Sequence, residues 1–196
     1  MPLSPPVVRR MRKHTRAIHI EAFAREDGLW DIDACITDTK TRDIPLASGV
    51  RLANTPIHEL WLRLTIDTQF NIVAVEAASD AVPYPGYCDT IGADYRKMIG
   101  LNLLSGFRHH LKQILSGTHG CTHLTELAQI LPTAAVQAFA GEVLDTRDGD
   151  AADLQNHKPF QLDRCHALRT DGAAVAKYYP RWASMPPADI PGNPAS

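Results

Sequence analysis

The sequence lacks a long apolar run and an excess of charge of either sign. Its 196 residues carry 20 Lys and Arg against 22 Asp and Glu, which leaves no overall electrostatic signature for nucleic acid or an anionic membrane surface. No apolar stretch approaches the roughly 20 residues that a membrane-spanning helix needs. No apolar segment follows the basic residues near the N-terminus, so we expect no secretory signal peptide. We therefore predict a cytoplasmic protein that binds neither nucleic acid nor membrane.

Familiar catalytic motifs are also missing. The sequence contains no Gly-rich phosphate loop, nucleophile elbow, His-Glu-x-x-His helix or dinucleotide fingerprint, so it indicates no named enzyme class. The chain contains four cysteines. In a reducing compartment we expect them to be free thiols or metal ligands rather than a disulfide framework.

Apolar and polar residues alternate in the first half of the chain, as they do in half-buried β-strands. The alternation predicts strands in four segments: 18–24, 30–36, 59–67 and 70–78. Asp27-Gly28 supplies the turn between the first two. Short connections between sequential strands predict an antiparallel sheet of two hairpins with one face buried.

The period of the apolar residues changes after the second hairpin. Steps of three and four residues predict one amphipathic helix from Asp89 to about residue 116, in which Gly100 or Gly106 could mark a kink. A second helix is predicted to begin near Thr122, and Pro132 either kinks it or opens a third. The predicted fold is therefore α+β, with two or three helices packed on the sheet.

Composition sets the expected domain limits. The 44% hydrophobic residues are enough for one sizeable core, which we predict over residues 18–183. Residues 1–17, with their short basic run, are expected to form a flexible arm. Residues 184–196 are rich in proline and are expected to be disordered.

The stretch "SGTHGCTHLTEL" (116–127) suggests a metal site. Cys121 and His123 open the second predicted helix, where the unpaired amides and the macrodipole favour a thiolate. His58 and Cys88 lie at two other junctions of regular elements, and such junctions can meet at one end of a sheet. Together the four residues would form the mixed sulfur and nitrogen shell of tetrahedral zinc. The alternative is that Cys121 is a small buried hydrophobe and His123 a surface residue.

Other residues are weaker candidates. Cys165 and His166 are adjacent, so both cannot easily bind one ion; either could complete the site, and a buried cysteine in a C-terminal strand is the simpler interpretation. Cys35 is expected in the core. Three histidines are expected to face solvent or to support the site from outside: His109, His110 and His119.

The run from "PYPGYCDTIGADY" to "GCTHLTEL", with "DGLWDIDACITDTK" and "PIHELWLRLTID" before it and "DRCHALRTDG" after it, resembles an uncharacterised bacterial family, the domain-of-unknown-function family 2889. The likeness covers about residues 18–183. It implies one intact domain and carries no reaction with it.

A more distant resemblance is to iron-sulfur cluster assembly scaffolds of the NifU and IscU type. In these scaffolds a cysteine follows a proline before a strand, a second cysteine follows the next strand, and a His-Cys pair opens a later helix. The resemblance places His58 at the first cysteine, Cys88 at the second, and Cys121 with His123 at the inverted pair, which Thr122 separates. With only two thiolates left, zinc or a mononuclear metal fits better than a cluster.

Three classes of function follow from these residues. The first is a metal-binding module, with a scaffold as one form of it, that holds zinc, or alternatively iron or an iron-sulfur cluster. The second is a metal-dependent hydrolase with an open coordination position and Glu59 or Asp89 as general base. The third is an interaction protein with structural cysteines. A partner protein, a small substrate and a homo-oligomer are all compatible with the sequence.

Overall fold

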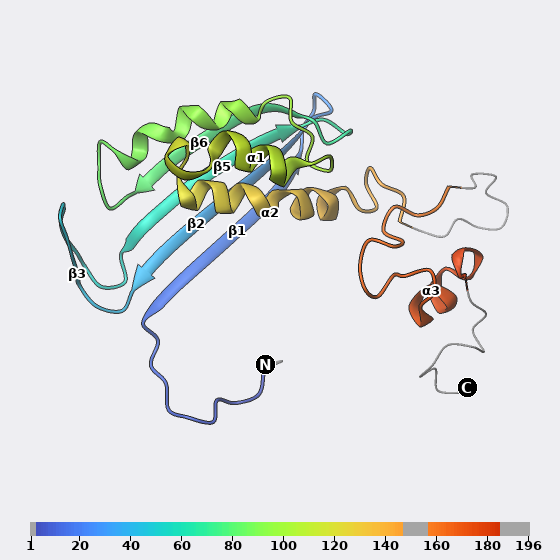
Figure 1. The fold of residues 1–196 in the computed structure, drawn as a ribbon, viewed down its shortest axis with the longest axis horizontal. Helices are drawn as coiled ribbons and strands as arrows, with labels where there is room; N and C mark the ends of the chain where they lie inside the picture. The colour runs from blue at the N-terminus through green and yellow to red at the C-terminus, as the bar shows by residue number, and fades with distance from the viewer. Residues whose placement is uncertain (1–2, 147–156, 185–196) are drawn as a thin grey trace. The chain divides into compact units, whose positions relative to one another are not determined.

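The computed structural model describes residues 3–146 and 157–184 (Figure 1). The chain divides into two compact units, Met1–Val136 and Gln137–Ser196, whereas the sequence pattern predicts one domain through residue 183. The tail predicted to be disordered lies outside the described residues, apart from Ser184. Within the described ranges no helix has both the length and the apolar character to span a membrane.

A four-stranded antiparallel sheet forms the centre of the first unit, which confirms the predicted α+β class (Figure 1). Its spatial order is β1-β2-β5-β6. The strands are β1 (His14–Ala24), β2 (Trp30–Lys40), β5 (Pro56–Ile66) and β6 (Ile72–Ala81). β1 begins four residues before the start that the alternation predicts, so it includes the end of the segment predicted as an arm. A small separate hairpin, β3 (Ile44–Leu46) with β4 (Gly49–Arg51), lies between β2 and β5 in the chain and was not predicted.

The predicted single helix from Asp89 to residue 116 is wrong. The segment forms a 3₁₀ helix, η1 (Cys88–Met98), and a separate α-helix, α1 (Phe107–Leu115). Gly100, just after η1, and Gly106, just before α1, have φ angles of 88° and 64°, in the left-handed region through which a helix cannot continue. Between them the chain pairs with the start of β6, where the Ile72 N–H donates to Leu101 O at 2.9 Å and the Gly100 N–H donates to Ile72 O at 2.8 Å.

The second predicted helix is confirmed. α2 (Thr122–Phe139) begins at the predicted residue and continues through Pro132. α1 and α2 lie across one face of the sheet (Figure 1). A short 3₁₀ turn, η2 (Gly117–His119), joins α1 to the start of α2.

The core lies between this sheet face and the helices. Alternate residues of β2 and β5 are almost fully buried there: Ile32, Ala34, Ile36, Leu60, Leu62 and Leu64. α2 adds Leu124, Leu127 and Leu131, all at 0% exposure. Burying each leucine or isoleucine contributes about 1.5–3 kcal/mol, so this apolar layer fixes both the sheet register and the place of α2.

The second unit is rich in turns. Its described regular elements after α2 are α3 (Ala173–Tyr178) and η3 (Pro180–Trp182). Gln161 Nε2 donates to Thr146 O at 2.6 Å, and the Tyr179 hydroxyl donates to the same oxygen at 3.1 Å. These side-chain hydrogen bonds hold the loops together where no β-strands do so among the described residues.

We expect Gly120→Ala to lower the free energy of unfolding by about 1–3 kcal/mol. A methyl group on Gly120 would overlap with the carbonyl oxygen of Leu115, at the end of α1, so the loop before α2 would have to shift. Chemical denaturation measures the change. Thr118→Ala, at an exposed position of the same loop, is the matched control, and equal stability of the two variants would contradict the prediction.

Candidate metal site

The candidate site begins where the apolar face of the sheet ends. Residues 32, 34 and 36 of β2 face the helices, and the same alternation brings Asp38 to this face one step further on. Asp38 is paired in register with Arg16 of β1 and with His58 of β5. The three side chains therefore form a polar row across the sheet, next to the apolar rows of the core.

Asp38 is the centre of this row. It is 4% exposed, and both of its oxygens are bound. Arg16 donates from Nε to Oδ1 at 2.9 Å and from Nη2 to Oδ2 at 2.8 Å, and His14 Nε2 lies 2.7 Å from Oδ1. Burial alone would raise the pKa of Asp38, but the hydrogen bonds from Arg16 and His14 outweigh it and hold the pKa at about 2. Asp38 is thus a carboxylate at neutral pH.

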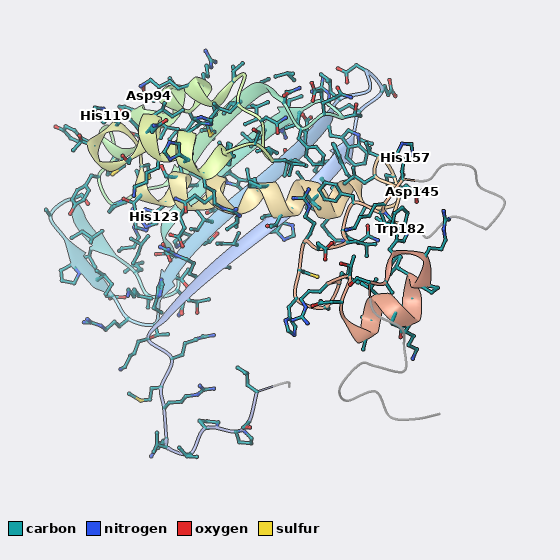
Figure 2. All side chains as sticks on the ribbon, turned by 45° about the vertical axis from the view of Figure 1, so that its right-hand side comes forward. Asp94, His119, His123, Asp145, His157 and Trp182 are labelled. Carbon is teal, nitrogen blue, oxygen red and sulfur yellow. The ribbon has the colours of Figure 1, made fainter. Side chains whose placement is uncertain are left out.

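Two imidazoles converge on Asp38 Oδ2. His58 Nδ1 is 3.2 Å from this oxygen, and His123 Nε2, from the first turn of α2, is 3.6 Å from it. The two rings are 3.8 Å apart between centroids and tilted by 31°. One ligand atom from each of the three residues lies within 4.8 Å of the others. Figure 2 shows His123 at the start of α2, beside the strands.

Both histidines favour the neutral form. The pKa of His58 is lowered by burial and then by the nearby His123, against the opposing effect of Asp38. The pKa of His123 is lowered by burial and then by the positive charge of Arg16. His58 Nδ1 is buried and makes no well-directed hydrogen bond within the described part of the chain. Neutral imidazole nitrogens that face a carboxylate oxygen are suited to bind a cation between them.

Tyr95 fixes the start of α2 above this cluster. It is 0% exposed, and its hydroxyl donates to Cys121 O at 2.8 Å and accepts from the Cys121 N–H at 3.0 Å. The Thr125 hydroxyl lies 2.7 Å from the hydroxyl oxygen of Tyr95. These bonds pair backbone groups that a helix N-terminus leaves unsatisfied, and they hold His123 over the sheet.

Cys121 lies beside the histidine pair but on the far side of one ring. Its Sγ is 4.0 Å from His123 Nδ1, whereas the nitrogen of His123 that faces Asp38 is Nε2. An N–H on Nδ1 directed at the sulfur would leave Nε2 with a free lone pair. Cys121 is thus placed to set the tautomer of His123 rather than to bind the same ion.

The remaining predicted site residues lie elsewhere. Cys88 opens η1 and is not part of the three-residue cluster, and Asp89 is exposed and accepts from the Gly86 N–H at 3.2 Å. Glu59 follows His58 on β5, so it points to the opposite face of the sheet. These placements leave the cluster without Cys88 and without either general-base candidate.

The peripheral candidates are exposed, except for one buried cysteine. Cys165 and His166 are exposed in the second unit, and Cys165 lies in a bend rather than in the buried strand that the simpler interpretation expected. Cys35 is buried, as predicted. His119 is exposed, and Figure 2 shows it at the outer edge of the helices, away from His123.

Four residues of the site were not predicted from the sequence: His14, Arg16, Asp38 and Tyr95. Asp38 could have been found, because the alternation of Ile32, Ala34 and Ile36 continues to it and a charged residue on a core face needs a partner. Arg16 could not have been found in this way, because its contact with Asp38 depends on the pairing register between β1 and β2.

Comparison with known proteins gives one family match. A family described as a protein of unknown function (DUF2889) matches residues 14–137. The chain belongs to the DUF2889 family. The matched residues include all four strands of the main sheet and the three residues Asp38, His58 and His123. The match confirms the family resemblance inferred from the sequence. No curated protein and no solved structure matches the chain, so the likeness to NifU and IscU scaffolds stays a prediction.

We expect Tyr95→Phe to lower the free energy of unfolding by about 1–3 kcal/mol, because the Cys121 N–H loses its acceptor in a buried place. Denaturant titration at neutral pH measures the loss. Tyr87→Phe, at an 81% exposed tyrosine close by, should leave stability unchanged. Equal stability of both variants would show that Tyr95 does not anchor α2.

The same tyrosine predicts an alkaline pH dependence. Burial raises the pKa of Tyr95 to about 12 from its ordinary value of 10.0. A raised pKa means that the folded state holds the proton more tightly, so its contribution is complete below about pH 10 and is lost as the pH rises toward 12. The stability difference between wild type and Tyr95→Phe should therefore shrink over this window. A difference that stays constant with pH would contradict the assignment.

Proposed function

We propose that the domain binds a divalent metal ion, zinc, through His58, His123 and Asp38. The observation that carries the proposal is the convergence of two neutral imidazole nitrogens on one oxygen of an ionised, buried carboxylate. Two histidines and a carboxylate are a ligand set found in zinc and non-haem iron proteins.

The spacing of the ligand atoms supports a tetrahedral ion. Bonds of about 2.0–2.1 Å to zinc place any two ligands of a tetrahedron about 3.3 Å apart. The separations from Asp38 Oδ2 are 3.2 Å to His58 Nδ1 and 3.6 Å to His123 Nε2, so small adjustments would suffice.

The local charge also favours a cation. Arg16 is bound to Asp38 and, at 2.6 Å, to Glu126, so one positive charge lies among two negative ones. With His58 and His123 neutral, these three charged groups sum to one negative charge. Arg16 and His14 would then act as hydrogen-bond donors to the ligating carboxylate, as supporting residues commonly do around metal ligands.

Zinc fits this site better than an iron-sulfur cluster. Clusters are held mainly by thiolates, and the one cysteine that borders the described cluster, Cys121, is directed at the outer nitrogen of His123. Iron(II) shares the ligand types, but the Irving–Williams order places zinc above it in affinity for a given site.

Metal analysis and reconstitution test the proposal. Protein treated with chelator and titrated with Zn²⁺ or Co²⁺ should take up about one ion per chain, and Co²⁺ should give the visible absorption of a tetrahedral site. We expect His58→Ala and His123→Ala to weaken binding by more than the roughly 10–100-fold that loss of a supporting contact costs. His119→Ala, an exposed histidine of the same loop region, is the matched control. Wild type that binds no stoichiometric metal while folded by circular dichroism would overturn the proposal.

The cysteines distinguish this ligand set from the one that the sequence suggested. We expect Cys88→Ala to bind metal as wild type does, because Cys88 is outside the cluster. Cys121→Ala should retain the stoichiometry and lose up to about tenfold in affinity through the His123 tautomer. Sulfur-to-cobalt charge-transfer absorption in the wild type, lost in either variant, would instead establish a thiolate ligand.

A metal-dependent hydrolase is the second candidate function. The observation in its favour is that three protein ligand atoms converge, which in a tetrahedral zinc site leaves the fourth position for water. Glu59 and Asp89 are directed elsewhere, so a base would have to come from other residues. Hydrolysis of activated ester or phosphoester substrates by the zinc-loaded protein, abolished in His58→Ala, would support this function, and a metal-loaded protein without turnover would favour simple binding.

A further inference from the structure

β1 is an edge strand of the sheet. It is the outermost strand of the sheet, and within the described ranges no strand lies on its outer side (Figure 1). Ten of its 11 residues are exposed, and Ile20 is half-buried. The exposed residues include two large apolar side chains, Ile18 at 39% and Phe23 at 48%.

The other edge of the sheet is covered. η1 packs along β6 so closely that a Cβ on Gly92 would lie 3.0 Å from Ala77 O. Residues 100–101 hydrogen-bond to Ile72 at the start of the strand. β6 is thus shielded from pairing with another chain.

β1 lacks several of the features that commonly prevent edge-to-edge pairing, although it carries the charged residues Arg16 and Glu21. It contains no proline, glycine or lysine, and its register with β2 runs without a bulge from His14 to Ala24. A long, regular edge strand that exposes apolar side chains offers its outward backbone groups to a second strand.

We propose that β1 pairs antiparallel with β1 of a second copy of this chain, so that the sheet continues across a symmetric dimer. A two-fold axis perpendicular to the sheet keeps the helices of both copies on the same face. Residues of β1 that face one side then lie opposite residues of the partner that face the same side.

One register of this pairing sets side chains that can hydrogen-bond opposite each other. Centred on Ile20, it sets His19 opposite Glu21 of the partner subunit, and Glu21 opposite His19 of the partner subunit. His19 and Glu21 are exposed, and they already lie 3.3 Å apart within one chain, so the pairing extends this contact across the junction. A register centred on His19 would instead set the two His19 side chains against each other.

The same register matches the apolar residues. The two copies of Ile20 meet, and Ile18 lies opposite Ala22 on the helix side of the sheet. On the other side Ala17 lies opposite Phe23. Cross-strand pairs of this kind are the unit by which strands stabilise one another. β1 is therefore complementary to a second copy of itself.

Charge exchange at two exposed positions tests the proposal. Wild type should be a dimer by analytical ultracentrifugation over a concentration series. His19→Glu sets a second carboxylate against Glu21 twice per dimer and should raise the dissociation constant at least about tenfold. The double variant His19→Glu/Glu21→Lys sets opposite charges across the junction and should restore the dimer. Glu76→Lys, an exposed charge change on β6, is the matched control and should leave the dimer intact.

Hydrogen exchange gives a second, independent measurement. The outward amides of β1 should be more protected at high than at low protein concentration in wild type, and this difference should vanish in His19→Glu. A monomeric wild type, a dimer that His19→Glu does not weaken, or a double variant that stays monomeric while folded would each overturn the proposal. Loss of the dimer in Glu76→Lys alone would place the interface elsewhere and also overturn it.

Discussion

A single buried carboxylate determines the layout of the first unit. An ionised Asp38 at the end of an apolar sheet face is tolerated only if it is paired and hydrogen-bonded, because an uncompensated buried charge costs several kcal/mol. Arg16 and His14 of β1 meet that requirement from one side. His58 and His123 approach from the other. The carboxylate therefore ties three strands and the start of α2 to one point, and the apolar core lies directly beside it.

The sheet could be predicted because a half-buried strand shows its period directly in the sequence. The segment 89–116 could not, because its pattern of burial resembles that of one long helix. Tyr95, Met98, Phe107 and Leu111 are indeed buried, but they come from a 3₁₀ helix and a separate α-helix. An apolar pattern records which residues face the core and only indirectly which backbone conformation brings them there. The two glycines with positive φ carried the missing information.

Two residues of the candidate site could be predicted from their positions relative to the strands and helices. His58 and His123 stand at junctions of regular elements, and junctions at the same end of a sheet do meet. Arg16 could not be placed, because its contact with Asp38 requires the register between β1 and β2. Cys121 was predicted as a metal ligand, and its Sγ instead lies 4.0 Å from the outer nitrogen of His123, because the direction of a side chain at a helix start depends on the turn before it. Here Tyr95 and the tightly packed Gly120 set that turn.

The long sequence separation of these residues has a consequence for the order of folding. Arg16 and Asp38 meet as soon as the first hairpin forms. His123 can join them only later, because α2 follows the sheet and α1 in the chain. Closing such distant contacts is slow compared with forming a hairpin, so the cluster is assembled late. A chain whose synthesis stops before α2 contains Asp38, Arg16, His14 and His58 but lacks His123. We therefore expect the three-ligand cluster to form only once α2 has been synthesised and has packed on the sheet.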